Sequence, residues 1–323
     1  MPLGLVSHTI NIIAGPTAVG KTALALDWAE ANGAEIVNAD AMLFYRGMDI
    51  GTAKPSRDEM ARVPHHLIDI QPVREAYSIK EYVAAARAVV LDIFNRNKAV
   101  LVVGGSGFYL RCFYAPVVDG IEPDPQVRAT VEQLEAIDGL PGLLKRLDSM
   151  NPKGTGKLHR ENPRRVARAL ERCLISGKSL LELEESFAAL PGPFDDFEKR
   201  SVLLLRPNDD LHPRVMARTT EMLRLGLVDE VRSLRNDGLE ENSPAANSIG
   251  YRETLAWLDH NDGVREDSHP LDGPLSEEDL SEAIQLSTRR LIAKQRKWFR
   301  NQFEPDLVIN GDPSLETLPF IAG

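Results

Sequence analysis

The stretch that decides the fold is Gly15, Pro16, Thr17, Ala18, Val19, Gly20, Lys21 and Thr22, which matches the pattern G-x-x-x-x-G-K-[ST]. An apolar, β-branched run precedes it at His8–Ala14, and a segment of helical composition follows at Ala23–Ala31. In that context the loop wraps backbone N–H groups around phosphate oxygens, while Lys21 adds a point charge and Thr22 can bind Mg²⁺. The motif, shared with ATP-binding proteins, predicts a bound phosphate or pyrophosphate. It does not by itself predict phosphoryl transfer.

Further apolar runs extend this unit into a sheet. Strands are predicted at Glu35–Ala39, Ala99–Val103 and Ser201–Leu205, with a short last strand at Leu307–Ile309 and a helix at Ile79–Asn95. Alternating strands and helices are typical of an α/β fold with a parallel sheet. We therefore expect a P-loop NTPase-like parallel sheet flanked by helices, with ligands at the carboxyl edge of its strands.

The composition changes near Ala115, where a proline-rich and acidic segment begins. The following residues are helical by pattern, without a convincing strand, up to about Arg200. This predicts a catalytic core made of residues 1–115 and 201–323, interrupted by an all-helical insertion at residues 116–200. The acidic, Gly- and Pro-containing segment from Asp259 to Asp279 is expected to be an exposed loop.

Composition excludes several classes of protein. The chain has 323 residues, a formal net charge of −10, 27% charged and 43% hydrophobic residues, and two cysteines. These values argue against wholesale disorder, a disulfide framework, a structural zinc site and nucleic-acid binding through bulk charge. No export signal or membrane span is predicted, so a cytoplasmic protein is expected.

Positive charge is nevertheless concentrated in two stretches. Lys153–Arg172 carries seven Lys or Arg residues against two Glu, and Arg289–Arg300 carries six with no acidic residue. Either stretch fits contact with nucleic-acid phosphates or an ordinary solvated helix face. The aromatic pair Trp298 and Phe299 in the second stretch fits simple packing as well.

Two polar residues follow predicted strands. The third strand runs into Gly104–Gly107 without the acidic residue that holds the metal in ordinary NTPases, so the Ser106 hydroxyl is a candidate for a metal or phosphate ligand; a plain tight turn is the alternative. Asp40 follows the second strand at the same edge, where a carboxylate would meet the group that attacks the substrate. It is a candidate base, although an Asp in this position is often a turn former or helix cap.

Seven blocks of sequence, in order and across nearly the whole chain, resemble bacterial tRNA dimethylallyltransferases. They are GPTAVGKTALAL (15–26), NADAMLFYRGMDIGTAKP (38–55), PHHLIDI (64–70), VVGGSGFYL (102–110), ENPRRVARALE (161–171), NSIGYRE (247–253) and KQRKWFR (294–300). The resemblance implies transfer of a dimethylallyl group from dimethylallyl diphosphate to N6 of adenine 37 in tRNA, next to the anticodon. It also implies Mg²⁺ as cofactor, and we expect a monomer.

The resemblance further assigns roles to individual residues. It makes Asp40 the base that accepts the N6 proton, Lys21 a pyrophosphate ligand, and Arg218 the arginine that clamps the leaving pyrophosphate; a helix surface charge is the other reading of Arg218. Thr22 and Ser106 would serve the metal and the pyrophosphate. The segments that match tRNA contacts comprise Asp40, Ala41, Met42, Leu43, Ser106, Arg164, Arg165, Val166, Ala167 and Arg168.

Two positions depart from the family pattern. Ala41 replaces the usual serine after the aspartate, which removes a hydroxyl and puts a substrate contact in doubt, whereas Ser106 replaces threonine and keeps the hydroxyl. Three other functions stay open at this point: a small-molecule or nucleotide kinase, an adenylate dimethylallyltransferase acting on the free nucleotide, and an RNA-binding protein with an inactive phosphate loop.

Overall fold

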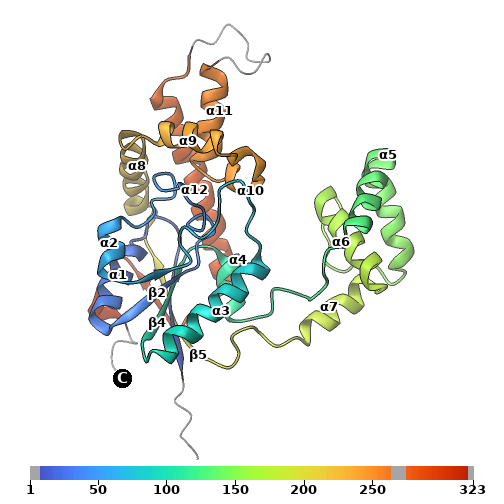
Figure 1. Ribbon diagram of the computed structural model, residues 1–323, viewed down its shortest axis with the longest axis horizontal. Coiled ribbons are helices and arrows are strands. Elements are labelled where there is room, and N and C mark those ends of the chain that lie inside the picture. The colour runs from blue at the N-terminus through green and yellow to red at the C-terminus, as the bar shows by residue number, and fades with distance from the viewer. Residues whose placement is uncertain (1–7, 263–273, 319–323) are drawn as a thin grey trace, which may run out of the picture. The chain divides into compact units, whose positions relative to one another are not determined.

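Six parallel strands form one sheet in the order β3-β2-β4-β1-β5-β6. Figure 1 shows the computed structural model. The strands are β1 Thr9–Ala14, β2 Ala34–Asn38, β3 His65–His66, β4 Ala99–Gly104, β5 Glu198–Leu205 and β6 Leu307–Asn310. The predicted α/β class with a parallel sheet is confirmed. β3 was not predicted, because two residues are too few to show an alternating pattern.

The structure describes residues 8–262 and 274–318. The loop expected between Asp259 and Asp279 therefore falls mostly outside the described residues. At its two ends the prediction was wrong, because α11 continues to Asn261 and α12 already begins at Glu277, where Ser276 accepts a hydrogen bond from the Asp279 N–H as helix cap.

Helices of very different length surround the sheet. The first half of the chain forms α1 Lys21–Asn32, α2 Arg57–Arg62, α3 Ile79–Asn95 and α4 Gly107–Leu110. After β5 follow α8 Asn208–Arg224, α9 Leu227–Asn236, α10 Ser243–Ala246, α11 Tyr251–Asn261 and α12 Glu277–Gln302. Short 3₁₀ turns lie at Arg111–Phe113, Leu239–Glu241 and Leu315–Thr317.

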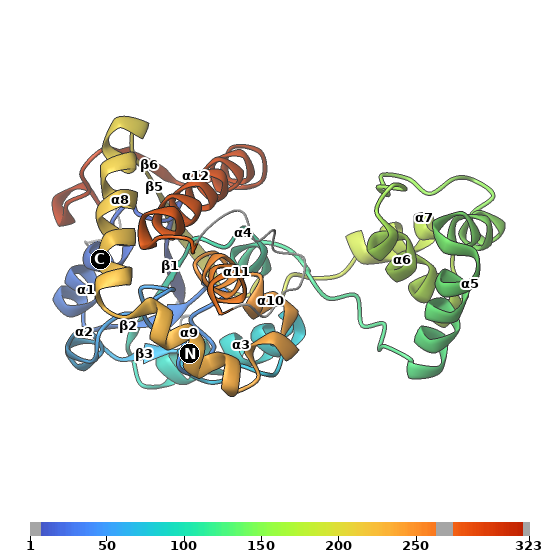
Figure 2. The ribbon, with the colours of Figure 1, turned by 90° about the horizontal axis from the view of Figure 1, so that it is seen from above.

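The order of the strands explains which helix covers which face. The connection from β1 to β2 through α1 passes over β4, whereas the connection from β3 to β4 through α3 runs in the opposite direction. Right-handed crossovers in opposite directions place their helices on opposite faces of a sheet. Figure 2 shows α1 and α3 on the two sides of the strands accordingly.

A separate compact unit extends from Ala115 to Pro193. It consists of α5 Pro125–Met150, α6 Pro163–Ser176 and α7 Leu180–Ala188, and its buried residues include Leu147, Val166 and Leu170. The unit ends earlier than the expected residue 200. The reason is that Phe194 stacks on Phe113, with 4.4 Å between the ring centroids, and so belongs to the core of the sheet unit.

The carboxyl ends of β2 and β4 approach each other very closely. The Ala39 N–H donates a hydrogen bond of 2.8 Å to the Val103 carbonyl. A Cβ atom placed on Gly104 would lie 2.4 Å from the Ala39 carbonyl oxygen. Only glycine fits at Gly104, and this contact fixes the chain immediately before Asp40.

Replacing Gly104 by alanine should therefore destabilise the protein. We expect the free energy of unfolding of Gly104→Ala to fall by about 1–3 kcal/mol, the usual effect of forcing atoms into a packed core. Denaturant unfolding followed by circular dichroism measures the change, and an unaltered midpoint would contradict the close approach.

Candidate functional site

The phosphate loop connects β1 to α1 and curls around the Lys21 side chain. Ala18 and Gly20 have positive φ values of 65° and 98°, the left-handed geometry that turns successive N–H groups inward. The Lys21 ammonium donates to the carbonyls of Gly15 at 2.9 Å and Pro16 at 2.7 Å. The lysine side chain is thus held against the backbone of its own loop.

Gln295 of α12 supports the loop from outside. Its side-chain oxygen accepts a 3.1 Å hydrogen bond from the Thr17 N–H, and its NH₂ group donates to the Gly105 carbonyl at 2.9 Å. One glutamine therefore ties the phosphate loop to the glycine turn after β4. Gln295 lies in the block KQRKWFR, in which sequence analysis considered the charges and the aromatic pair but not the glutamine.

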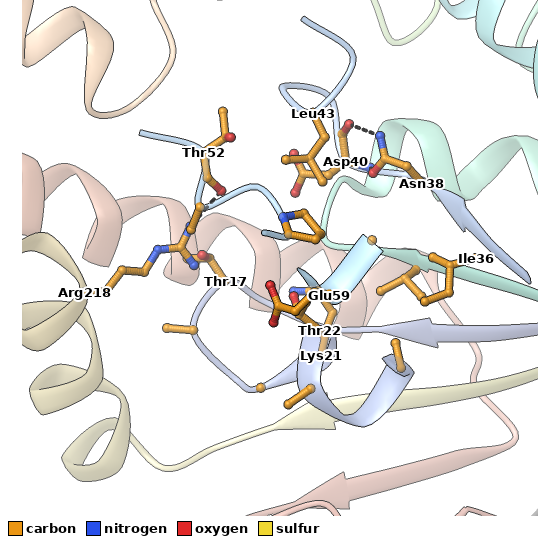
Figure 3. Close-up of a pocket in the computed structure, with 18 of the residues that line it drawn as sticks. Thr17, Lys21, Thr22, Ile36, Asn38, Asp40, Leu43, Thr52, Glu59 and Arg218 are labelled. Atoms are coloured by element: carbon orange, nitrogen blue, oxygen red, sulfur yellow. Dashed lines mark hydrogen bonds between the residues drawn. The ribbon is translucent and has the colours of Figure 1, made fainter. Parts of the chain in front are cut away.

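A cavity of about 500 Å³, the loop cavity, opens beside these residues (Figure 3). Its lining includes Lys21 and Thr22 of the loop, Asp40 after β2, and Arg218 of α8. In Figure 3 their side chains converge on the space between the loop, the segment after β2, and α8. Apolar side chains form another part of the wall, among them Ile36, Leu43, Ile68 and Val103.

Asp40 is held by a small hydrogen-bond network. Its N–H donates to the Asn38 side-chain oxygen at 2.8 Å, and one of its carboxylate oxygens accepts the Met42 N–H at 3.2 Å. Asn38 is itself fixed, because its main-chain carbonyl accepts the hydroxyl of buried Tyr82 at 3.0 Å. The two interpretations of Asp40 from the sequence were a turn former and a catalytic base. Asp40 does form a turn, and it also faces the cavity, as a base must.

Arg218 reaches the same cavity from α8. Its guanidinium donates a 3.0 Å hydrogen bond to the Thr52 carbonyl (Figure 3). Burial lowers the pKa of Arg218 from its ordinary value, and the nearby Asp40 carboxylate opposes this effect. Arg218 is thus an inward-facing cation and not a helix surface charge.

The segment that carries Thr52 is clamped by Glu230 of α9. One carboxylate oxygen of Glu230 accepts the N–H groups of Asp49 at 3.0 Å and Ile50 at 2.7 Å. The other accepts the Gly51 N–H at 3.1 Å and the Tyr251 hydroxyl at 2.6 Å. Four donors from two distant parts of the chain meet on this single side chain, which sequence analysis missed.

A second cavity of about 560 Å³, the helix cavity, adjoins the first. Both cavities are lined by Thr17, Asp40, Thr52, Arg218 and Gln295, which form their common boundary. Residues of the helix cavity that do not line the loop cavity include Ala41, Met42, Ser106, Asn247, Lys294 and Trp298. The boundary containing Asp40 can therefore be reached from two sides.

The two hydroxyl groups expected to serve a metal are divided between the cavities. Thr22 lines the loop cavity and Ser106 the helix cavity. Ser106 is the N-cap residue of α4 and makes no side-chain cap hydrogen bond, which leaves its hydroxyl available to a substrate. Within residues 8–262 and 274–318, no group of three or more His, Cys, Asp or Glu residues is placed to hold a metal.

The expected RNA-contacting segment of the helical unit lies at the start of α6. Arg164 and Arg165 are exposed, and Arg168 is exposed while paired with Glu171 at 2.9 Å. Ala167 is partly buried, and Val166 is 0% exposed in the core of the unit. The expected contact at Val166 thus cannot come from its side chain, because the helix turns that side inward.

The buried surroundings of Lys21 change its acidity. Its pKa is lowered from 10.5 to about 8, chiefly because burial disfavours the ammonium, with Asp40 raising it and Arg218 lowering it further. Lys21 is charged below pH 8 and loses its charge as the pH rises through that value. An anion in the loop cavity would favour the charged form.

The fold and these cavities define an α/β protein of the phosphate-loop type, whose loop faces a carboxylate and an arginine across a cavity. The IPP transferase family model matches residues 43–302, and the chain belongs to this family. The earlier resemblance is thereby confirmed. No helix in the described part of the chain has the length and apolar character to cross a membrane.

Individual relatives are similar in sequence to this chain along most of their length. The chain is 50% identical to a tRNA dimethylallyltransferase of Opitutus terrae over 297 residues, covering 92% of this chain and 91% of the relative. It is 37% identical to the tRNA dimethylallyltransferase of Geobacter sulfurreducens, covering 90% and 88%.

Solved structures are similar as well. A tRNA isopentenylpyrophosphate transferase of Bacillus halodurans matches with a TM-score of 0.64 and 29% identity, covering 96% of this chain and 92% of that one. A eukaryotic dimethylallyltransferase crystallised while acting on tRNA has a TM-score of 0.78 at 24% identity, covering 98% and 77%, and shows the likeness of fold.

The shifted pKa of Lys21 should be visible in anion binding. For inorganic pyrophosphate, we expect the Kd measured by calorimetry to rise as the pH increases through 8, because the lysine charge is lost. Lys21→Arg keeps its charge over this pH range, so the change of its Kd with pH measures the titration of pyrophosphate itself and serves as the control. Parallel pH profiles for the two proteins would contradict the shift.

The Glu230 clamp should matter for both stability and the site. Glu230→Gln replaces one accepting oxygen by a donor, so that two of the four donors lose their partner, and should lower the free energy of unfolding by about 1–3 kcal/mol. It should also weaken pyrophosphate binding, because Thr52 no longer supports Arg218. Glu240→Gln, at an exposed residue, serves as control. If both variants had the same free energy of unfolding and the same Kd for pyrophosphate, the role assigned to Glu230 would be refuted.

Proposed function

We propose that this chain transfers the dimethylallyl group of dimethylallyl diphosphate to N6 of adenine 37 in tRNA, releasing pyrophosphate. One observation carries the proposal: the phosphate loop, Asp40 and Arg218 meet at a boundary between two cavities. Two substrates can approach such a boundary from different sides. The names of the similar bacterial relatives support the same reaction.

The loop cavity fits the prenyl donor. Loop N–H groups, Lys21 and Arg218 offer positive charge for the pyrophosphate, and Ile36, Leu43, Ile68 and Val103 offer an apolar wall for the five-carbon chain. Arginine suits this role because its planar fork matches two phosphate oxygens at once.

The helix cavity fits the acceptor base. It is lined by both apolar and polar side chains, including Trp298, Asn247 and Ser106. A base must leave the anticodon stack to enter such a cavity, at a cost of roughly a few kcal/mol. We assign the Ser106 hydroxyl to this side, as one of the RNA contacts, and not to the metal.

The chemistry takes place where the cavities meet. The N6 nitrogen forms a bond to the allylic carbon, the bond from that carbon to oxygen breaks, and its electron pair leaves with the pyrophosphate. Asp40 accepts the N6 proton through the carboxylate that the Met42 N–H holds in place. Lys21, Arg218 and the loop amides stabilise the growing negative charge, which is the larger part of the catalysis.

Mg²⁺ is the proposed cofactor. The donor set fits, because the Thr22 hydroxyl lies on the loop cavity and Mg²⁺ commonly binds through few protein oxygens plus substrate phosphates. When bound, the ion would neutralise pyrophosphate charge. Thr22 would hold it.

Contact with the tRNA backbone is assigned to exposed cations in both units. Arg164 and Arg165 of α6 and Lys294 of α12 carry charges that suit phosphate contacts, which position an RNA without reading its sequence. Binding should therefore weaken steeply with salt. We further propose that the chain acts as a monomer in the cytoplasm.

An adenylate dimethylallyltransferase is the closest alternative, since it shares the donor and the chemistry. The helical unit with its exposed arginines favours an acceptor larger than a free nucleotide. The strong identity to relatives named for tRNA also favours RNA.

Nucleoside mass spectrometry tests the proposal. Unmodified tRNA incubated with the protein, dimethylallyl diphosphate and Mg²⁺ should yield N6-(dimethylallyl)adenosine, with AMP present as competing acceptor. Asp40→Asn should lower the rate by about 10²–10⁴-fold, the usual contribution of a general base. Product on AMP alone would indicate the adenylate enzyme, and product on neither acceptor would refute prenyl transfer.

A further inference from the structure

Arg206, the first residue after β5, is a buried cation that none of the assigned roles uses. Only 4% of its surface is exposed. Its Nε donates to the Val19 carbonyl at 2.8 Å. Its two terminal nitrogens bind the carboxylates of Asp210, at 2.5 Å, and Asp312.

The residue is itself anchored from a further element. The Arg206 main-chain carbonyl accepts a hydrogen bond from Arg296 of α12, whose guanidinium also binds Asn208. Arg206 thus joins the end of β5, the start of α8, α12 and the segment after β6. These contacts fix its orientation.

Val19 belongs to the phosphate loop, and its carbonyl determines the direction of the next N–H group. In a trans peptide the C=O and the following N–H point in opposite directions, and the described chain has no cis peptide bonds. The Val19 side chain is buried, whereas Gly20 lines the loop cavity. A carbonyl held outward by Arg206 therefore turns the Gly20 N–H toward the ligand side.

We propose that Arg206 is a positioning residue of the phosphate loop, which holds the peptide between Val19 and Gly20 so that the Gly20 N–H binds pyrophosphate. The fork geometry of arginine is required, because one side chain must reach a carbonyl and two carboxylates at once. Lysine supplies the charge but not the three directed contacts. The inference rests on the proposed function only in naming pyrophosphate as the ligand.

Arg96 provides a matched control at the other edge of the sheet. It also joins two carboxylates, those of Glu35 and Asp92, and Glu35 is buried near the amino end of β2. Removing Arg96 therefore breaks a comparable ion-pair network away from the phosphate loop. Its loss measures the general effect of such a deletion on stability.

Calorimetric titration of the full-length chain with inorganic pyrophosphate and Mg²⁺ tests the proposal. Arg206→Met should raise the Kd by about tenfold, equivalent to one lost hydrogen bond to a charged ligand. The Kd of Arg206→Lys should lie between those of Arg206→Met and the native protein. This variant keeps the test available if Arg206→Met does not fold. Arg96→Met should lower the melting temperature but leave the Kd within about twofold of native.

Steady-state kinetics separates positioning from general stability. The KM for dimethylallyl diphosphate should rise in the Arg206 variants while the KM for tRNA stays unchanged. Equal Kd values for native, Arg206→Lys and Arg206→Met would overturn the inference and leave prenyl transfer intact. Conversely, if the Arg206 variants bind pyrophosphate more weakly than the native protein but the native protein modifies no tRNA, the proposed function alone is refuted.

Discussion

The parallel pairing of β1, β4 and β2 is the constraint on which the candidate site depends. In this register Ala14 lies opposite Gly104, and Asn38 opposite Val103, so that the three strands end at one edge. The phosphate loop, the glycine turn after β4 and Asp40 leave the sheet at that edge within a few residues of one another. The close approach at Gly104 then leaves little freedom to the chain that carries the carboxylate.

The remaining groups come from helices far along the chain, and polar contacts hold them. Arg218 binds the Thr52 carbonyl, Glu230 binds the three preceding N–H groups, and Gln295 joins the phosphate loop to Gly105. Because unpaired polar groups are costly when buried, such contacts tend to be all formed or all lost. These contacts hold the Arg218 guanidinium facing the loop cavity, and a charge held in place in this way is the condition for effective electrostatic stabilisation of a leaving group.

Much of this arrangement could be predicted from the sequence, because apolar runs indicate strands and glycine-rich segments indicate turns. The phosphate loop, five of the six strands, the long α3 and the placement of Asp40 at the carboxyl edge all followed from local pattern. Glu230, Gln295 and Arg206 could not, because their partners are backbone groups more than 150 residues away in sequence. Val166 shows the opposite difficulty: a matching segment identified a helix, but only the packing of that helix shows which of its residues face inward.

Glycine-rich loops of this type often hold the phosphates of nucleotides that undergo phosphoryl transfer, whereas here the proposed reaction breaks the bond between carbon and oxygen and leaves pyrophosphate whole. Dimethylallyl diphosphate labelled with ¹⁸O in the oxygen that bridges carbon and phosphorus distinguishes the two. After reaction with tRNA, mass spectrometry should find the label entirely in the released pyrophosphate. Label remaining with the five-carbon alcohol would mean attack at phosphorus, and would contradict the central role assigned to Asp40 and the loop cavity.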